Sequence, residues 1–263
     1  MIRTSGCGIA SGSSGSPGRE IRKRSVLPEW ERLLSSAARL QRIVPGGVLV
    51  GGTAAALHAG HRISKDADHV LGDLRTRFDR ILAELESVAG WKTARKHRPV
   101  LILGSLDGID TGVRQLIRTV PLETTVVEGP GGSLVIPTYA EILRIKGVLA
   151  LRRNATRDYL DFAALSDGLG GDRTARAFDR FDSLYPQENG QSALQQLLVQ
   201  LASPRPFDLS EQTLSEYANL DPRWHEWQAV EAACADAAMA MFDRASRLGR
   251  QRPEDPSPNN ARK

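Results

Sequence analysis

The stretch that decides the fold runs from Leu49 to Asp68 and reads Leu-Val-Gly-Gly-Thr-Ala-Ala-Ala-Leu-His-Ala-Gly-His-Arg-Ile-Ser-Lys-Asp-Ala-Asp. The apolar residues before the glycine pair, Gly51 and Gly52, predict a short buried strand that ends at the pair. Residues 54–59 predict a short helix, and Gly60 is placed to end it, because glycine readily adopts the left-handed conformation found there. The aspartates then open a second strand.

Asp66 and Asp68 begin this second predicted strand, residues 66–71. Because side chains alternate along a strand, both carboxylates and the Ser64 hydroxyl lie on one face. Two adjacent carboxylates repel each other unless a cation lies between them, and Mg²⁺ is commonly bound by one or two carboxylates plus substrate phosphates. The sequence therefore predicts a metal site at Asp66 and Asp68 for Mg²⁺, with Mn²⁺ as the alternative ion. The competing interpretation is a solvated strand edge or a helix-capping acid.

The glycine pair before the short helix predicts a phosphate site. Its backbone N–H groups lie at a helix N-terminus, where phosphate binds well, and glycine lets a phosphate approach the backbone closely. We expect Gly51, Gly52 and Thr53 to cradle the phosphates, although many ordinary strand-to-helix turns also use glycine. Arg62 is a predicted phosphate contact. Ser64 is expected to bind a phosphate or a neighbouring aspartate.

The rest of the chain predicts an α/β (α+β) fold, in which a mixed sheet with flanking helices precedes a helical C-terminal subdomain. Thr138 and Glu141 form a T-x-x-E capping box that opens a helix ending near Arg152. Helical periodicity is found at 30–40, 78–88, 157–169 and 227–245, and strand patterns at 48–50, 66–71, 100–103, 109–117, 124–127 and 134–136.

The glycine pair, short helix and Asp-x-Asp together resemble the polymerase-β-like nucleotidyltransferases. The longer stretch from Gly51 to Asp68 resembles the AbiEii/AbiGii toxin family in particular. So does the later stretch from Lys146 to Arg152, which is followed by Arg157-Asp158-Tyr159-Leu160-Asp161. The resemblance covers roughly residues 45–170.

The resemblance implies a magnesium-dependent, two-metal transfer of a nucleotide from a nucleoside triphosphate. Asp66 and Asp68 would hold the metal, and a third carboxylate on a following strand would complete the site. Asp110 is the candidate for that position, with Asp107 nearby, and a turn aspartate in a Gly-rich hairpin is the alternative. The acceptor implied is an RNA 3′ end, such as that of tRNA, or a protein side chain. The biological setting implied is a bacterial toxin–antitoxin or phage-defence pair, with a cognate antitoxin as partner.

Lys146 lies on the apolar stripe of its predicted helix, since Ile142, Lys146 and Leu149 follow one another at i, i+4 and i+7. An unpaired ammonium on such a face is costly. Lys146 is therefore expected either to extend to a solvent edge or to meet an anion. That anion would be the triphosphate or a site carboxylate such as Asp161, and in either case we count Lys146 among the catalytic candidates.

The second motif supplies three further nucleotide-binding candidates, Arg157, Asp158 and Asp161. Arg157 is a predicted phosphate contact. Asp158 and Asp161 begin a helix, where acids also complement the helix dipole, but Asp161 is expected to face inward more. His61 is expected to be an ordinary hydrogen-bonded loop histidine.

Composition limits the class of protein. A net charge of +4 and a pI near 9.3 permit a phosphate-rich partner without requiring one. No apolar run approaches the ~20 residues that span a bilayer, the N-terminus lacks the apolar segment of a secretory signal, and the two cysteines, Cys7 and Cys234, are too few for a disulfide framework or a zinc site. We expect a cytoplasmic protein without a membrane partner.

Four segments follow from composition and pattern. Residues 1–25, rich in Gly and Ser and then basic, predict a disordered arm, and residues 249–263 predict a second disordered tail. Between them we expect a nucleotidyltransferase core at 26–136 and a helical subdomain at 137–248 that completes the site. Two alternatives remain at this point, which are a small-molecule enzyme of the aminoglycoside nucleotidyltransferase type and a catalytically inactive nucleotide-binding module.

Overall fold

The computed structural model describes residues 28–188, 190–210 and 214–250. The predicted arm at 1–25, with Cys7, lies outside the described residues, and so does the predicted tail from residue 251 onward. Within the described ranges no helix is both long and apolar enough to cross a membrane. The predicted fold class is confirmed, because a mixed five-stranded sheet with flanking helices precedes a helical region.

The central sheet has the order β1-β2-β5-β4-β3. Strands β2 and β5 are parallel and every other neighbouring pair is antiparallel. The strands are β1 (Val48–Leu49), β2 (Asp66–Leu71), β3 (Trp91–His97), β4 (Leu101–Leu106) and β5 (Ile109–Gln115). The parallel pair therefore lies in the middle of the sheet, and β2 carries both aspartates of the predicted metal site.

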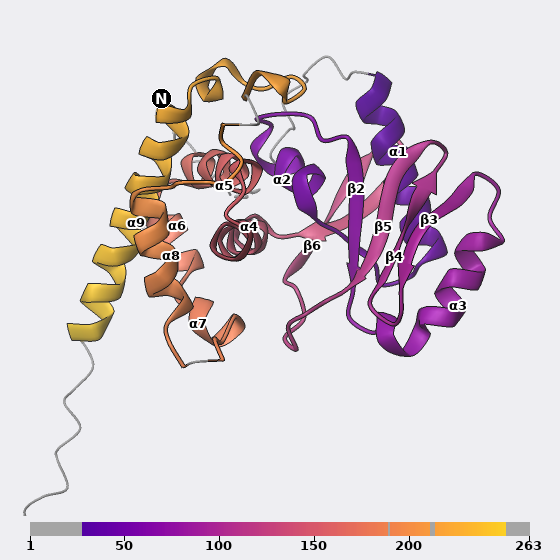
Figure 1. The fold of residues 1–263 in the computed structure, drawn as a ribbon, viewed down its shortest axis with the longest axis horizontal. Helices are drawn as coiled ribbons and strands as arrows, with labels where there is room; N and C mark the ends of the chain where they lie inside the picture. Colours follow the sequence, from indigo (N-terminus) through magenta and orange to yellow (C-terminus); the bar gives the residue numbers. More distant parts are fainter. Residues whose placement is uncertain (1–27, 189, 211–213, 251–263) are drawn as a thin grey trace, which may run out of the picture.

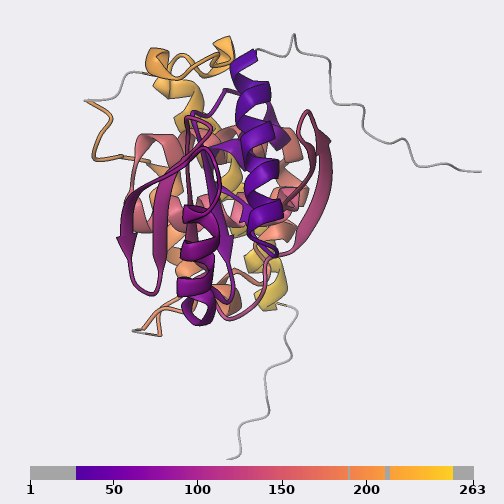
Figure 2. The same cartoon turned by 90° about the vertical axis from the view of Figure 1, so that its right-hand side faces the viewer.

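Helices α1 (Pro28–Ile43) and α3 (Leu74–Glu86) cover one face of this sheet, as Figure 2 shows. Residues 67, 69 and 71 of β2 point into that layer and are buried. On the other face, α2 (Gly51–Ala59) lies between the sheet and α5 (Thr156–Leu169) (Figure 1). The alternation along β2 therefore turns Asp66 and Asp68 away from the α1–α3 layer.

A separate hairpin of β6 (Thr124–Gly129) and β7 (Gly132–Pro137) packs beside the sheet. Gln41 of α1 donates to the Val135 carbonyl and accepts from the Val135 N–H, both at 2.8 Å. Leu134 and Ile136 share one apolar cluster with residues of α1, β1 and β2. The hairpin thus packs against α1 and the sheet, and the chain continues from it into the helical C-terminal half.

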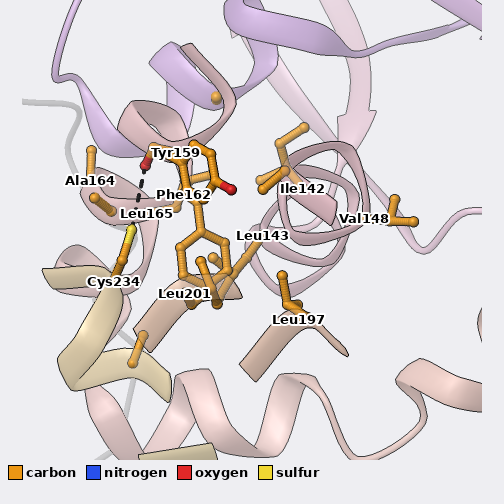
Figure 3. Packing of buried hydrophobic residues seen from close by; sticks show 14 of the residues in the cluster. Ile142, Leu143, Val148, Tyr159, Phe162, Ala164, Leu165, Leu197, Leu201 and Cys234 are labelled. Atoms are coloured by element: carbon orange, nitrogen blue, oxygen red, sulfur yellow. Dashed lines mark hydrogen bonds between the residues drawn. The ribbon is translucent and has the colours of Figure 1, made fainter. Parts of the chain in front are cut away.

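The helical half packs around α4 (Tyr139–Arg153) and α5, with α6 (Gly171–Ala177), α7 (Phe181–Leu184), α8 (Ala193–Ala202), η1 (Leu214–Glu216), η2 (Pro222–Trp224) and α9 (Trp227–Arg250). Figure 3 shows the centre of this core, where Phe162 of α5 lies among Leu143, Leu197 and Leu201. Cys234 of α9 is buried and its thiol contacts the Tyr159 carbonyl at 4.0 Å. Burial raises the pKa of this thiol, so it stays protonated as a core residue.

Two predictions about helix ends need correction. Helix α2 begins at Gly51 rather than at residue 54, although it ends at Gly60, which is left-handed with φ 64°, as predicted. At the start of α4, Thr138 accepts from the Glu141 N–H at 3.3 Å, but the Thr138 N–H donates to the Glu123 carbonyl. Only half of the capping box forms, because the buried Glu141 carboxylate binds arginines instead.

The burial of His69 predicts that the folded protein loses stability as the pH falls. His69 is buried on the α1–α3 side of β2, and burial lowers its pKa to about 4 from 6.5. The unfolded chain therefore binds a proton that the folded protein does not, so stability is full above pH 6.5, falls as the pH drops toward 4 and is level below that. We expect His69→Leu to remove roughly 2–3 kcal/mol of this acid-induced loss, measured by urea unfolding at pH 7 and pH 4.5. The same pH slope in both proteins would contradict this assignment.

Candidate active site

Three carboxylates lie on the open face of the parallel strand pair. Asp66 of β2 is paired in register with Asp110 of β5, and Asp68 is paired with Gly112. Register partners in neighbouring strands share a face, and residues two apart in one strand do so as well. All three aspartates line one cavity of about 930 Å³ between the sheet and the helical half. The fold thus gathers the carboxylates that sequence reasoning named.

The electrostatics of the aspartate pair favour a cation. Burial raises the pKa of Asp68, and the Asp66 carboxylate raises it further, whereas Arg114 opposes both effects. The Arg114 Nε lies 3.9 Å from the Asp68 carboxylate, which is too long for a strong ion pair. Asp66 accepts a hydrogen bond of 2.8 Å from the Ser64 hydroxyl. A cation between the two carboxylates would relieve their repulsion.

The donor set fits a hard divalent ion that keeps part of its own shell. Across the described ranges, no three His, Cys, Asp or Glu side chains are already gathered as a closed metal cage. Mg²⁺ does not need such a cage, because one or two carboxylates with water and substrate phosphates satisfy it. Asp66 and Asp68 supply two oxygen ligand groups at the cavity, and Asp110 lies beside them.

The N-terminus of α2 opens on the same cavity. Gly51 has φ 72° and both glycines line the cavity. Val50 occupies the N-cap position, and among the described residues no side chain caps this end, so its N–H groups are available to an anion. Thr53 behaves differently, since it is buried and its hydroxyl donates to the Asp66 carbonyl. The Thr53 side chain therefore ties α2 to β2 and does not face the cavity.

Gly52 is required by close packing. A Cβ at this position would lie 2.4 Å from Arg62 Nη2 and 2.9 Å from the Ser64 hydroxyl. Arg62 cannot move freely, because it is hydrogen-bonded to Asp161. We expect Gly52→Ala to cost about 1–3 kcal/mol and to weaken nucleotide binding, measured by thermal unfolding and titration. Gly72→Ala is the matched control, since a methyl there meets no described atom within 4 Å, and equal behaviour of the two variants would contradict the prediction.

A buried ion-pair cluster supports the floor of the cavity, and it consists of His61, Arg62, Lys146, Asp158 and Asp161. The Asp161 carboxylate is fully buried and receives His61 Nε2 at 2.7 Å, Arg62 Nε at 2.8 Å and Lys146 Nζ at 2.7 Å. Lys146 Nζ also lies 3.1 Å from Asp158 Oδ1. The cluster therefore joins the loop before β2 to α4 and α5.

The surroundings of Asp161 and His61 determine which of the two carries a charge. Burial alone would raise the pKa of Asp161, but Arg62 and Lys146 hold it well below its usual range. Burial lowers the pKa of His61, so the neutral imidazole donates from Nε2 to Asp161. Lys146 is only 3% exposed. The expectation that it extends to solvent is wrong, and the alternative pairing with Asp161 is confirmed.

The two acids of the second motif have different positions. Asp158 lines the cavity, and its buried Oδ2 atom has no hydrogen-bond partner among the described residues. Asp161 does not line the cavity, so it does not contact a nucleotide directly. It instead positions Arg62 and Lys146, both of which line the cavity.

Arginines form a basic rim at the cavity, and the sequence analysis had selected Arg157 among them but not Arg114, Arg152 or Arg153. Arg152 and Arg153 end α4, and Arg157 follows in α5, and all three are exposed at the cavity. Arg153 and Arg157 are close enough to Asp68 to lower its pKa. Arg114 of β5 completes the set. The signal available in the sequence was the cluster of arginines at the boundary between two helices.

Similarity to this chain is found among curated proteins and among solved structures. No family model matches it. Among curated proteins, the heme uptake protein MmpL11 of Mycobacterium tuberculosis is 33% identical over 228 residues, which covers 81% of this chain and 23% of that protein. The mycolic acid-containing lipids exporter MmpL11 of Mycolicibacterium smegmatis is 34% identical over 139 residues, covering 52% of this chain and 14% of that protein. The chain thus spans at most about a quarter of the length of the curated relatives it matches.

Solved structures give a second set of likenesses. A putative nucleotidyltransferase from Helicobacter pylori has a TM-score of 0.45 at 16% identity, covering 85% of this chain and 96% of that one. JHP933 from the same organism has a TM-score of 0.44 at 16% identity, over 84% and 93% of the two chains. The antibiotic-resistance factor ANT(2'')-Ia has a TM-score of 0.43 at 13% identity, over 59% and 91%. Likeness at this level identifies neither a family nor an activity for this chain.

Proposed function

We propose that the protein is a magnesium-dependent nucleotidyltransferase that transfers a nucleoside monophosphate from a nucleoside triphosphate to an acceptor hydroxyl. The observation that carries this proposal is the placement of Asp66, Asp68 and Asp110 on one face of the parallel strand pair. The uncapped N-terminus of α2 opens on the same cavity. Carboxylates for a metal and amides for a phosphate are thereby adjacent.

Each residue has a distinct part in the proposed reaction. Gly51 and Gly52 bind the phosphates through their N–H groups, and Asp66 and Asp68 hold Mg²⁺, which supplies charge neutralisation for the triphosphate in this chemistry. The acceptor oxygen forms a bond to the α-phosphorus while the bond to the bridging oxygen breaks, and pyrophosphate leaves. Asp110, exposed beside Asp66, would complete the metal site as the third carboxylate and accept the proton of the attacking hydroxyl.

Cations around the cavity stabilise the phosphates. Lys146 and Arg62 face it from the ion-pair cluster, which fixes their side chains before a ligand arrives. Prepositioned charges of this kind contribute more than mobile ones, because no reorganisation is needed when charge develops. Arg157 extends the same positive field to the rim.

The acceptor that fits the rim is a polyanion, and we propose an RNA 3′ end such as that of tRNA. Arg152, Arg153 and Arg157 would contact its phosphates, as arginines do in most nucleic-acid complexes. An aminoglycoside-type acceptor is a cation and would be repelled by this rim. A protein hydroxyl next to acidic residues is the remaining acceptor class. The resemblance to AbiEii/AbiGii toxins supports a toxin role with an antitoxin partner.

The decisive test is incubation of the protein with each labelled nucleoside triphosphate, Mg²⁺ and total RNA. We expect label to appear in RNA, and to disappear when EDTA is added. Labelling of a protein instead would identify the other acceptor class. If the triphosphates bind in a Mg²⁺-dependent way but none is turned over with RNA, protein or aminoglycoside, the chain is a nucleotide-binding module without transfer activity.

A further inference from the structure

The cavity changes character along its sheet wall. Ser64, Asp66 and Gly52 lie together at one end, since the Ser64 hydroxyl binds Asp66 and approaches the Gly52 backbone. From Asp66, the wall follows β2 to Val70, ~13 Å away at a strand rise of ~3.3 Å per residue. Beyond the ends of β2 and β5, the chain continues into Leu116 and Ile117, which also line the cavity.

The helix wall also carries aliphatic residues at a distance from the carboxylates. At the end of α4, Arg152 and Arg153 line the same cavity as Asp66 and Asp68. Glu141, in the first turn of α4, binds Arg118 of the segment after β5. Between these ends, Ile145 and Leu149 line the cavity, and Ile145 lies ~12 Å from Arg153 at the helical rise of ~1.5 Å per residue. Away from the carboxylates both walls therefore carry aliphatic side chains, with Arg114, Arg118 and Lys146 beside them.

We call the second part the apolar end, lined by Ile117, Val120, Leu122, Ile145, Leu149 and Leu184. Ile117 is 84% exposed and Val120 is 39% exposed although both line the cavity. Large aliphatic side chains held at the mouth of a cavity lose contact with water when a ligand covers them. The apolar end is thus built to be covered by an apolar group.

The segment that carries Ile117 and Val120 is held in place by Arg118. Its guanidinium donates to the carbonyls of Val120 and Pro121, both at 2.8 Å, and lies 2.8 Å from the Glu141 carboxylate. It also donates to the Tyr185 hydroxyl at 3.2 Å. Because Arg118 binds both this segment and the helical half through its N–H groups, the apolar end is formed before any ligand binds.

We infer that the apolar end binds the base of the donor nucleoside triphosphate. This inference rests on the proposed function and extends it to a second subsite. The cavity presents amide groups and carboxylates at one end and, ~13 Å farther along β2, aliphatic side chains bordered by Arg114 and Arg118. A nucleoside triphosphate has the same order, because its phosphates lie at one end, the α-phosphate and ribose follow, and a planar base lies at the other.

The test compares a nucleotide with a ligand that lacks the base. Ile117→Ser removes apolar surface from an exposed position, so the fold is retained. We expect it to weaken binding of a non-hydrolysable Mg²⁺–nucleoside triphosphate by about fivefold, as partial loss of one aliphatic contact does. Binding of Mg²⁺–tripolyphosphate should stay unchanged. Val199→Ser, at a 76% exposed site on α8 outside the cavity wall, is the matched control.

The outcomes separate this inference from the proposed function. If wild-type protein transfers nucleotides and Ile117→Ser binds them as tightly as wild type, the base subsite is wrong while the proposed function stands. The same holds if tripolyphosphate weakens in parallel, or if only the KM for the RNA acceptor rises. If wild-type protein binds no nucleoside triphosphate at all, the proposed function fails and the base subsite fails with it.

Discussion

Replacing Asp66 or Asp68 by asparagine is expected to abolish nucleotide transfer, with a loss on the order of 10³-fold or more, and to leave the fold intact. Each change removes one carboxylate ligand charge from the proposed Mg²⁺ site, and metal-assisted phosphoryl chemistry depends on that charge. The same change relieves repulsion, since burial and the neighbouring Asp66 raise the pKa of Asp68. The melting temperature should hold or rise. Transfer of label from a nucleoside triphosphate and thermal unfolding measure the two effects.

Two further variants make this experiment specific. Asp172→Asn is the matched control, because Asp172 lies on α6 with its side chain 86% exposed, and its transfer rate should equal that of wild type. Asp110→Asn tests the third position, and we expect a loss as large as that of the pair. Near-wild-type transfer by Asp66→Asn or Asp68→Asn would show that the metal site lies elsewhere. A fully active Asp110→Asn would remove only the third carboxylate from the proposal.

Lys146→Met is expected to destabilise the protein by about 3–5 kcal/mol, because it breaks a buried ion pair and leaves one partner charged. Asp161 keeps His61 and Arg62, but Asp158 loses the contact to Lys146 Nζ while its other oxygen is already unpartnered among the described residues. Transfer should fall by at least a factor on the order of 10², since one prepositioned cation is removed from the phosphates. Urea unfolding and single-turnover transfer report the two losses separately.

A double variant distinguishes structure from catalysis. Lys146→Met combined with Asp158→Asn removes both members of the pair, so we expect most of the lost stability to return while transfer stays low. Recovery of both properties would mean that Lys146 serves only to neutralise Asp158. A single variant as stable as wild type would show that the buried pair has no energetic weight, contrary to the contacts at 3.1 Å and 2.7 Å.

The sequence predicted the strands and helices whose apolar residues recur with a clear period. The strand at β2, its two aspartates and the end of α2 at Gly60 are in this class, because alternation and glycine conformation are local properties. Strand β3 was not predicted. It is an edge strand whose side chains after Trp91 are mostly polar and exposed, so it shows no alternation and is held by pairing with β4.

The site residues likewise divide into those that local sequence geometry brings together and those that only the tertiary fold brings together. Asp66 and Asp68 are two residues apart, so strand geometry alone brings them together. The contact between His61 and Asp161 joins residues 100 positions apart in the chain, and no local pattern encodes such a distance. The sequence could show that Lys146 needed an anion, because it lies on an apolar stripe. It left Asp161 and the triphosphate as alternative partners of Lys146. In the protein without a ligand, Lys146 pairs with the buried Asp161.

The ion-pair cluster and the contacts of Arg118 have a joint consequence for dynamics. The cluster links the loop before β2 to α4 and α5 at the charged end, while Arg118 links the segment after β5 to Glu141 and Tyr185 at the apolar end. The two walls are thus cross-linked at both extremities, which leaves little freedom for a hinge between them. We expect ligands to enter through the open side without domain closure, and backbone relaxation dispersion on the microsecond-to-millisecond timescale to be nearly absent in both walls.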